Sequence, residues 1–173
     1  MNVLITRRQP LNVVGMLIRT NLQENRIREL WTEFIARMDE LQETAVPECS
    51  LGICSTIEGE EDENCFEYMA ARVVKDDSVI PSGMIFRRLP EQEVAVFTHQ
   101  GSLDTLGETY DYIYHEWLPA SGYEIAEADE IEWYDRRFKY EQKDSEMDVH
   151  IPIKPKKTAD EILDHLILVS EKL

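Results

Sequence analysis

The chain has 173 residues, enough for one domain of ordinary size. Its hydrophobic content of 43% is sufficient for a core, which excludes a wholly disordered chain. Eighteen basic and 35 acidic residues give a formal net charge of −17, so we expect no direct binding to nucleic acid or to an anionic membrane. The negative field instead favours cationic small molecules and basic protein surfaces as partners.

Cysteine usage and the apolar runs bear on the compartment. No stretch approaches the roughly 18 apolar residues of a membrane-spanning helix, and residues 1–6 are too short for the apolar part of a signal peptide. Cys49, Cys54 and Cys65 form no CxxC pair, which favours a reducing compartment. We therefore expect a cytoplasmic protein. A zinc site made of these cysteines and His99 would lack the paired knuckle spacing, so we expect no metal and no cofactor.

Residues 11–75 predict a strand, a helix and two further strands. The segment 11–20 is rich in aliphatic and β-branched side chains, as is typical of a strand. The helix that follows has Asn25 as its expected N-cap and an apolar stripe at helical spacing. The stripe consists of Ile27, Leu30, Trp31, Phe34, Ile35, Met38 and Leu41. The runs 51–58 and 65–74 flank an acidic turn and predict a hairpin.

Residues 93–155 predict the same order of elements a second time. The first of these elements is a strand over 93–99. A helix is expected to begin in the run 105–108, whose sequence Thr-Leu-Gly-Glu fits a capping box, and to end before the proline and glycine that follow its apolar stripe. Two strands, over 123–135 and 147–155, complete the unit, separated by a charged stretch.

The predicted fold class is α+β. The units 11–75 and 93–155 are expected to form one curved antiparallel sheet with two main helices, joined through a short strand at 84–89. Residues 1–156 would make up this domain, with a ligand cleft near the pseudo-twofold axis. A further helix is expected in 157–173, either docked on its own domain or forming a homodimer contact.

The segment 130–135 carries the most informative polar residues. Alternate residues of a strand point to opposite faces, which places Glu130, Glu132 and Tyr134 together. If this face meets solvent, the carboxylates are part of a charged surface. If it meets a cleft, Glu132 is a buried acid that needs a partner, and a ligand cation would supply one. Periodicity leaves both readings open.

Several segments in order carry a family pattern. They are Leu51–Ile53, Phe66–Tyr68, Leu89–Gly101, Tyr110, Trp117–Leu118, Gly122–Tyr123, Ile131–Asp135 and Met147–Ile153. The first two resemble the hairpin of the GyrI-like, AraC-type effector-binding family, and the third resembles its "lPag.yavf.h.G" stretch. The next three resemble its helix with the "WL…sGY" ending, and the last two resemble its "E.Y" strand and its closing "iPi" strand. The resemblance covers residues 11–155 and implies a fold of two strand–helix–strand–strand units, in agreement with the pattern described above.

The resemblance also implies a pocket for lipophilic, often cationic, small molecules. An acidic residue of the "E.Y" strand faces the ligand in that family, and this role falls on Glu132. Tyr68 corresponds to the hairpin aromatic. The further ligand-binding residues implied are Tyr110, Trp117 and Tyr134. Ala70 and Ala71 stand where many members have a glycine, a departure that would narrow the pocket or change its backbone path.

Three functions follow as hypotheses. The leading one is a stand-alone protein, rather than an enzyme, that senses or sequesters a lipophilic, cationic compound. About ten residues precede the first predicted strand, so we expect no DNA-reading domain of the kind that many relatives have. The second is a small-molecule hydrolase with Glu132 as acid or base, which requires that burial raise its pKa. The third is an acidic inhibitor of the gyrase-inhibitor type, acting through the runs 58–63 and 124–132.

Overall fold

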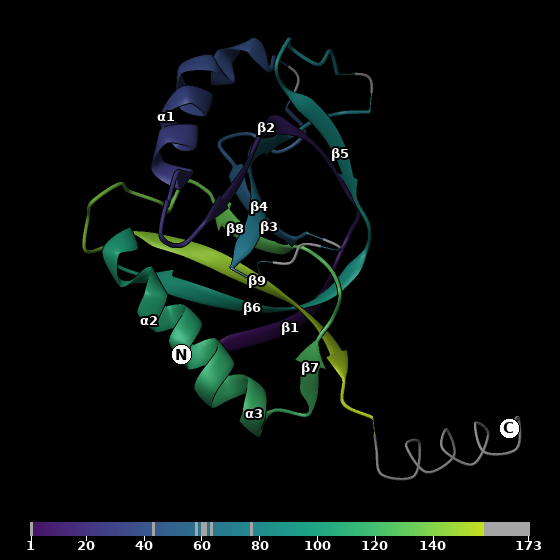
Figure 1. Ribbon diagram of the computed structural model, residues 1–173, viewed down its shortest axis with the longest axis vertical. Helices are drawn as coiled ribbons and strands as arrows, with labels where there is room; N and C mark the ends of the chain where they lie inside the picture. The colour runs from purple at the N-terminus through teal and green to yellow at the C-terminus, as the bar shows by residue number, and fades with distance from the viewer. Residues whose placement is uncertain are drawn as a thin grey trace, which may run out of the picture.

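The computed structural model describes residues 2–42, 44–57, 59, 62, 64–76 and 78–157. It confirms an α+β fold with one large antiparallel sheet and two main helical segments (Figure 1). The strands are β1 (Val3–Arg8), β2 (Leu11–Asn21), β3 (Ser50–Thr56), β4 (Cys65–Val73), β5 (Ile85–Leu89), β6 (Gln92–Gln100), β7 (Tyr123–Ile125), β8 (Glu130–Tyr134) and β9 (Glu146–Pro155). The first helical segment is α1 (Ile27–Arg37) with the 3₁₀ turn η1 (Met38–Glu40).

The sheet has the strand order β1-β6-β9-β8-β3-β4-β2-β5, and β7 pairs with β9. The two predicted units therefore each supply three neighbouring strands, β2, β4 and β3 in one case and β6, β9 and β8 in the other. The antiparallel pair β3–β8 joins them at the middle of the sheet. Each edge strand pairs with the unit that does not follow it in the sequence. β1 precedes the first unit but pairs with β6 of the second, and β5 precedes the second unit but pairs with β2 of the first. A symmetry between the units stays a prediction.

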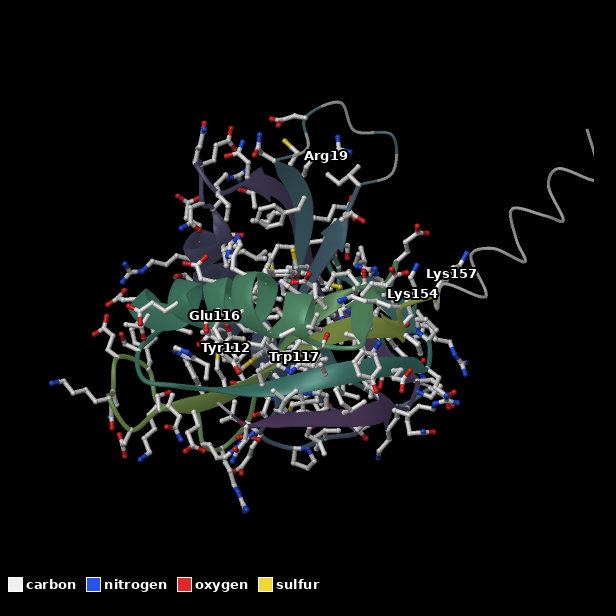
Figure 2. The ribbon with its side chains drawn as sticks, turned by 90° about the horizontal axis from the view of Figure 1, so that it is seen from below. Arg19, Tyr112, Glu116, Trp117, Lys154 and Lys157 are labelled. Atoms are coloured by element: carbon white, nitrogen blue, oxygen red, sulfur yellow. The ribbon has the colours of Figure 1, made fainter. Side chains whose placement is uncertain are left out.

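Both helical segments cover the same face of the sheet. Directly opposed residues of neighbouring strands share a face. One such row crosses the sheet through Met16, Ala70, Gly52, Glu132, Val149, Phe97 and Val3. Leu30 and Phe34 of α1 pack on this face in the first unit, and Ile113 of the second helical segment packs on it beside Phe97. In Figure 2 Tyr112, Glu116 and Trp117 are labelled along that second segment.

The opposite face of the central strands is also buried. Its core consists of Val13, Cys49, Leu51, Ile53, Met69, Ala71, Val73, Leu89 and Ile131, each of which is at most 3% exposed. Strand β8 therefore has a buried apolar residue, Ile131, on one face and the carboxylates of its neighbours on the other. Because both faces of β8 are covered, the alternation of polar and apolar residues could not show which face meets solvent.

Three predicted details of the strands and caps are wrong. The first strand begins at Val3, because β1 is added to the far side of β6. The predicted strand 123–135 is two strands, and between β7 and β8 the Ala128 N–H donates to the Ala126 carbonyl at 2.9 Å. Asn25 is not an N-cap, since it adopts a positive φ of 42° and Arg26 takes the cap position.

The second helical segment is a composite. It consists of η2 (Leu103–Thr105), α2 (Leu106–Asp111), the π-helical turn η3 (Tyr112–Trp117) and α3 (Leu118–Ala120). The expected capping box at its start is wrong, because the Thr105 hydroxyl donates to the Ser102 carbonyl at 3.0 Å instead of capping the helix. The helix predicted in 157–173 lies, except for residue 157, outside the described residues. Within the part that the structure describes, no helix has the length and apolarity needed to cross a membrane.

Candidate ligand site

The carboxylate of Glu132 accepts hydrogen bonds from three tyrosines. Tyr68 Oη donates to Oε2 at 2.6 Å, Tyr134 Oη donates to the same oxygen at 2.8 Å, and Tyr110 Oη donates to Oε1 at 3.3 Å. Four of the five residues that the sequence predicted for the site are thus brought together from β4, β8 and α2. Glu132 as a whole is a half-buried residue. A charged group surrounded by neutral donors is held in place without a counter-charge.

Gly52 allows this arrangement. It lies opposite Glu132 in the β3–β8 pair and opposite Ala70 in the β3–β4 pair. A Cβ atom at Gly52 would stand 2.0 Å from Tyr68 Oη and 2.7 Å from Glu132 Oε2. The tyrosine and the glutamate therefore meet above β3 in the space that the missing side chain leaves. Sequence analysis assigned Gly52 to the family hairpin and gave it no role in the site.

Helix α1 supplies an aromatic residue that the sequence analysis placed in the core. Trp31 Nε1 donates to Tyr68 Oη at 3.1 Å, and its ring meets Tyr134 edge-on at a centroid distance of 5.2 Å. Trp31 is half-buried. Its position in the apolar stripe of α1 gave no signal of this contact, because helical spacing shows only that the residue faces the sheet.

A second carboxylate lies beside the first. Tyr114 Oη donates to Glu130, which points to the same face of β8 as Glu132. Cys54 of β3 is paired with Glu130 in register, and burial next to these carboxylates raises the pKa of its thiol to about 12. The Cys54 thiol is therefore neutral at ordinary pH and adds no charge beside the two glutamates.

Burial sets the electrostatics of both glutamates. It raises the pKa of Glu132, against the lowering effect of the three phenol hydrogen bonds and of His99. Burial also raises the pKa of Glu130, with a further raising effect from the charge of Glu132. The pKa of Tyr68 is raised by its burial and by Glu132, so this phenol stays a donor. In the described part of the chain, neither glutamate forms an ion pair.

The raised pKa of Glu132 predicts a pH-dependent stability that the variant Glu132→Gln lacks. Between the ordinary value of 4.5 and the raised pKa, the folded state binds more protons than the unfolded state. The free energy of unfolding of the unchanged protein should therefore fall, relative to that of Glu132→Gln, as the pH rises through this window. Urea unfolding of both proteins from pH 4.5 to pH 8 measures the difference. Parallel profiles would contradict the prediction.

Trp117 lies with another set of rings. It meets Phe97 of β6 edge-on at 5.0 Å and stacks on Tyr123 of β7 at 6.3 Å, and no hydrogen bond or ring contact in the described residues joins it to Glu132. The structure therefore groups Trp117 with the core under the second helical segment. A direct ligand contact at Trp117 stays a prediction.

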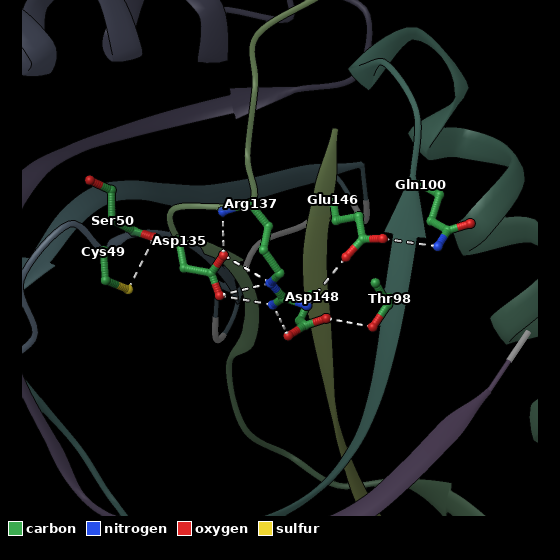
Figure 3. A network of polar contacts seen from close by, with 8 residues as sticks. All are labelled: Cys49, Ser50, Thr98, Gln100, Asp135, Arg137, Glu146 and Asp148. Carbon is green, nitrogen blue, oxygen red and sulfur yellow. Dashed lines mark hydrogen bonds and ion pairs between the residues drawn. The ribbon is translucent and has the colours of Figure 1, made fainter. Parts of the chain in front are cut away.

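The segment after β8 is fixed by a charged network (Figure 3). Arg137 donates to Asp135 at 2.8–3.1 Å and to Asp148 of β9 at 2.5 Å, and Thr98 of β6 donates to the other oxygen of Asp148 at 2.7 Å. Hydrogen bonds from Arg137 lower the pKa of Asp135. Since Asp135 directly follows Tyr134, the network anchors the strand end that carries this ring.

One open depression of the molecule lies away from the predicted site. A depression of about 820 Å³ lies at the end of β6 and the start of α2, and Glu132 and the four predicted aromatic residues do not line it. Its lining residues are Asn2, Thr98, His99, Gln100, Thr105, Glu108, Thr109, Tyr112, Arg137 and Glu146. Among the residues described, no group of three or more His, Cys, Asp or Glu side chains is placed to hold a metal ion.

Comparison with known families decides what kind of domain this is. The model of the GyrI-like small molecule binding domain matches residues 1–154. The chain belongs to the GyrI-like family. This GyrI-like domain is thus a small-molecule-binding domain by family, and the resemblance drawn from its motifs is confirmed.

Individual relatives of the GyrI-like domain differ in length and description. The transcriptional regulator BrlR of Pseudomonas aeruginosa is 33% identical over 154 residues, which are 88% of this chain and 56% of BrlR, so the chain spans just over half of that relative. The structure of SAV2435 bound to tetraphenylphosphonium has a TM-score of 0.68 at 16% identity and covers 89% of this chain and 94% of that one. A structure of a hydrolase encoded by lin2189 from Listeria innocua has a TM-score of 0.55 at 14% identity, with 88% and 91% covered.

Proposed function

We propose that this GyrI-like domain binds a lipophilic organic cation and that Glu132 opposes the positive charge of the ligand. The observation that carries the proposal is the carboxylate of the half-buried residue Glu132, which the hydroxyls of Tyr68, Tyr110 and Tyr134 hold with no ion pair in the described part of the chain. Removing a carboxylate from water is costly unless a positive group compensates it. A ligand cation would supply that compensation.

The aromatic surroundings suit an apolar cation. The rings of Tyr110, Tyr134 and Trp31 are half-buried around the carboxylate and offer electron-rich faces that attract a positive charge. A charge paired at close range in a poorly hydrated site contributes about 1.5–3 kcal/mol. The structural neighbour SAV2435, which is bound to tetraphenylphosphonium, supports this choice of ligand class, since that compound carries one positive charge inside four phenyl rings.

We further propose that residues 1–156 form the binding domain and that its ligand enters between the two units, beside the β3–β8 pair. Trp117 would act there indirectly, by fixing the helical segment that carries Tyr110 on Phe97 and Tyr123. A homodimer through 157–173 is an additional proposal that the described residues do not address. We also propose that the protein acts in the cytoplasm, where it would sense or sequester its ligand.

A thermal-shift experiment tests the proposal. Tetraphenylphosphonium at 100 times its dissociation constant should stabilise the fold by about 2.7 kcal/mol, or about 5–10 °C in melting temperature for a chain of this size. Tetraphenylborate has the same shape and the opposite charge and should give no stabilisation. Equal shifts with both ions, or no shift with any of a panel of lipophilic cations, would contradict the proposal.

Hydrolysis is the second candidate function. It is favoured by the burial that raises the pKa of Glu132, as an acid or base catalyst requires, and by the likeness to the Listeria innocua hydrolase. Incubating the protein with small ester and epoxide electrophiles distinguishes it from binding. Turnover that is lost in Glu132→Gln would support an enzyme, whereas stabilisation without turnover would support a binding protein. The acidic runs of the gyrase-inhibitor hypothesis lie partly outside the described residues.

A further inference from the structure

Two tyrosine–carboxylate pairs lie side by side between β8 and the second helical segment. Tyr110 Oη donates to Glu132, and Tyr114 Oη donates to Glu130. The two tyrosine rings are nearly parallel, with an interplanar angle of 9° and centroids 6.3 Å apart. This spacing matches the strand, because residues two apart in a strand are separated by about 6–7 Å on one face.

The spacing of the two tyrosines along the helical segment matches the spacing of the two glutamates along β8. Tyr110 lies in α2 and Tyr114 in the π-helical turn η3, and their stacked rings have centroids 6.3 Å apart. Tyr110 and Tyr114 have this separation, while Glu130 and Glu132 have the two-residue separation of the strand. The helical segment and the strand thus present two tyrosine–carboxylate pairs side by side. Glu130, like Glu132, accepts a hydrogen bond from a tyrosine of the helical segment.

The residues of β3 that lie beside these two tyrosine–carboxylate pairs are small. Gly52 is opposite Glu132, and Cys54 is opposite Glu130. Neither offers a positive group, and both glutamates are half-buried residues. The described part of the chain contains no ion pair to either of them, and the nearby Arg87 is paired with Asp129 at 3.0 Å. One positive centre would therefore compensate only one of the two carboxylates.

From this geometry we infer that Glu130, with Tyr114, forms a second cation subsite, and that the ligand class this domain prefers is an organic dication with positive centres about 6–7 Å apart. The inference rests on the proposed function of Glu132 and adds the number and spacing of the charges that the ligand carries. A monocation would bind at Glu132, where three phenols hold the carboxylate, and would leave the negative charge of Glu130 without a counter-charge.

The test compares mono- and dications of one chemical type. α,ω-Bis(phenyldimethylammonium) alkanes with spacers of two to ten methylenes are titrated against the protein by calorimetry, with phenyldimethylalkylammonium as the monocation. The best dication should bind at least about tenfold tighter than the monocation, with an optimum at a short spacer. In Glu130→Gln this gain should disappear, while the monocation keeps its affinity within about threefold.

Three controls make the outcome decisive. Glu132→Gln should weaken both ligands, and if it weakens neither, the proposed function fails whatever Glu130 does. Glu124→Gln on β7 removes the same charge from a carboxylate that is paired with Lys154, and it should affect neither ligand. Tyr114→Phe keeps the carboxylate and should retain most of the preference for the dication. Dications that bind no tighter than the monocation, or a Glu130→Gln variant that weakens both ligands equally, would overturn the inference while leaving the role of Glu132 intact.

Discussion

Glu132→Gln is expected to weaken the binding of tetraphenylphosphonium by about 10- to 150-fold at neutral pH. Glutamine has nearly the same shape and keeps an acceptor oxygen for the phenols of Tyr68 and Tyr134, which now donate at 2.6 and 2.8 Å. The variant therefore removes the negative charge and leaves the packing in place. Isothermal titration calorimetry of both proteins gives the ratio of the two dissociation constants.

A matched control separates the local charge from the field of the whole molecule. The chain has a net charge of −17, which by itself attracts cations. The Glu124 carboxylate on β7 lies 3.5 Å from Lys154 Nζ and its side chain is 46% exposed, so Glu124→Gln makes the same change in net charge at another position. Equal losses of affinity in the two variants would show that the ligand responds to the overall field and would contradict a specific role for Glu132.

Gly52→Ala is expected to have a comparably large effect through shape alone. The added Cβ would stand 2.0 Å from Tyr68 Oη, and the Tyr68 ring is only 2% exposed and cannot move freely. The phenol must shift away from Glu132, and overpacking of this kind costs about 1–3 kcal/mol of stability. We expect a melting temperature lower by about 3–10 °C, and at least a tenfold loss of cation affinity because the carboxylate loses its strongest donor.

Gly107→Ala is the matched control for this substitution. Gly107 lies in α2, and no atom stands within 4 Å of the position its Cβ would take. Alanine in a helix is favoured over glycine by about 0.5–1 kcal/mol, so this variant should melt at a slightly higher temperature and bind the cation unchanged. Gly52→Ala with normal binding would show that Tyr68 is not required to hold Glu132.

Periodicity and turn residues predicted most of the fold because they report local geometry. The helix of 27–37, the hairpin of β3 and β4, and the strands β6 and β9 follow directly from apolar spacing. The strand β1 was not predicted, because its six residues are few and do not alternate regularly between apolar and polar types. The π-helical turn at 112–117 escaped as well, since it places no residue type at a distinctive position.

The site was predictable only in part, for a related reason. Strand parity grouped Glu132 with Tyr134, and the family resemblance added Tyr68, which is 64 positions away in the sequence. Strand parity could not show which side of β8 faces solvent, because Ile131 on one face is fully buried and Glu132 on the other is half-buried. Trp31 and Gly52 join the site through tertiary contacts, and a residue in an apolar helical stripe or a glycine in a hairpin carries no sign of such contacts.

The central claim is that the Glu132 carboxylate recognises the positive charge of a ligand, and a cycle of four dissociation constants tests it most directly. Tetraphenylphosphonium and the neutral triphenylphosphine oxide are each titrated against the unchanged protein and Glu132→Gln. We predict that the substitution weakens the cation at least about tenfold and the neutral compound less than about twofold, a coupling of about 1 kcal/mol or more. Equal losses for both ligands would contradict the claim and would make Glu132 a structural residue of the site.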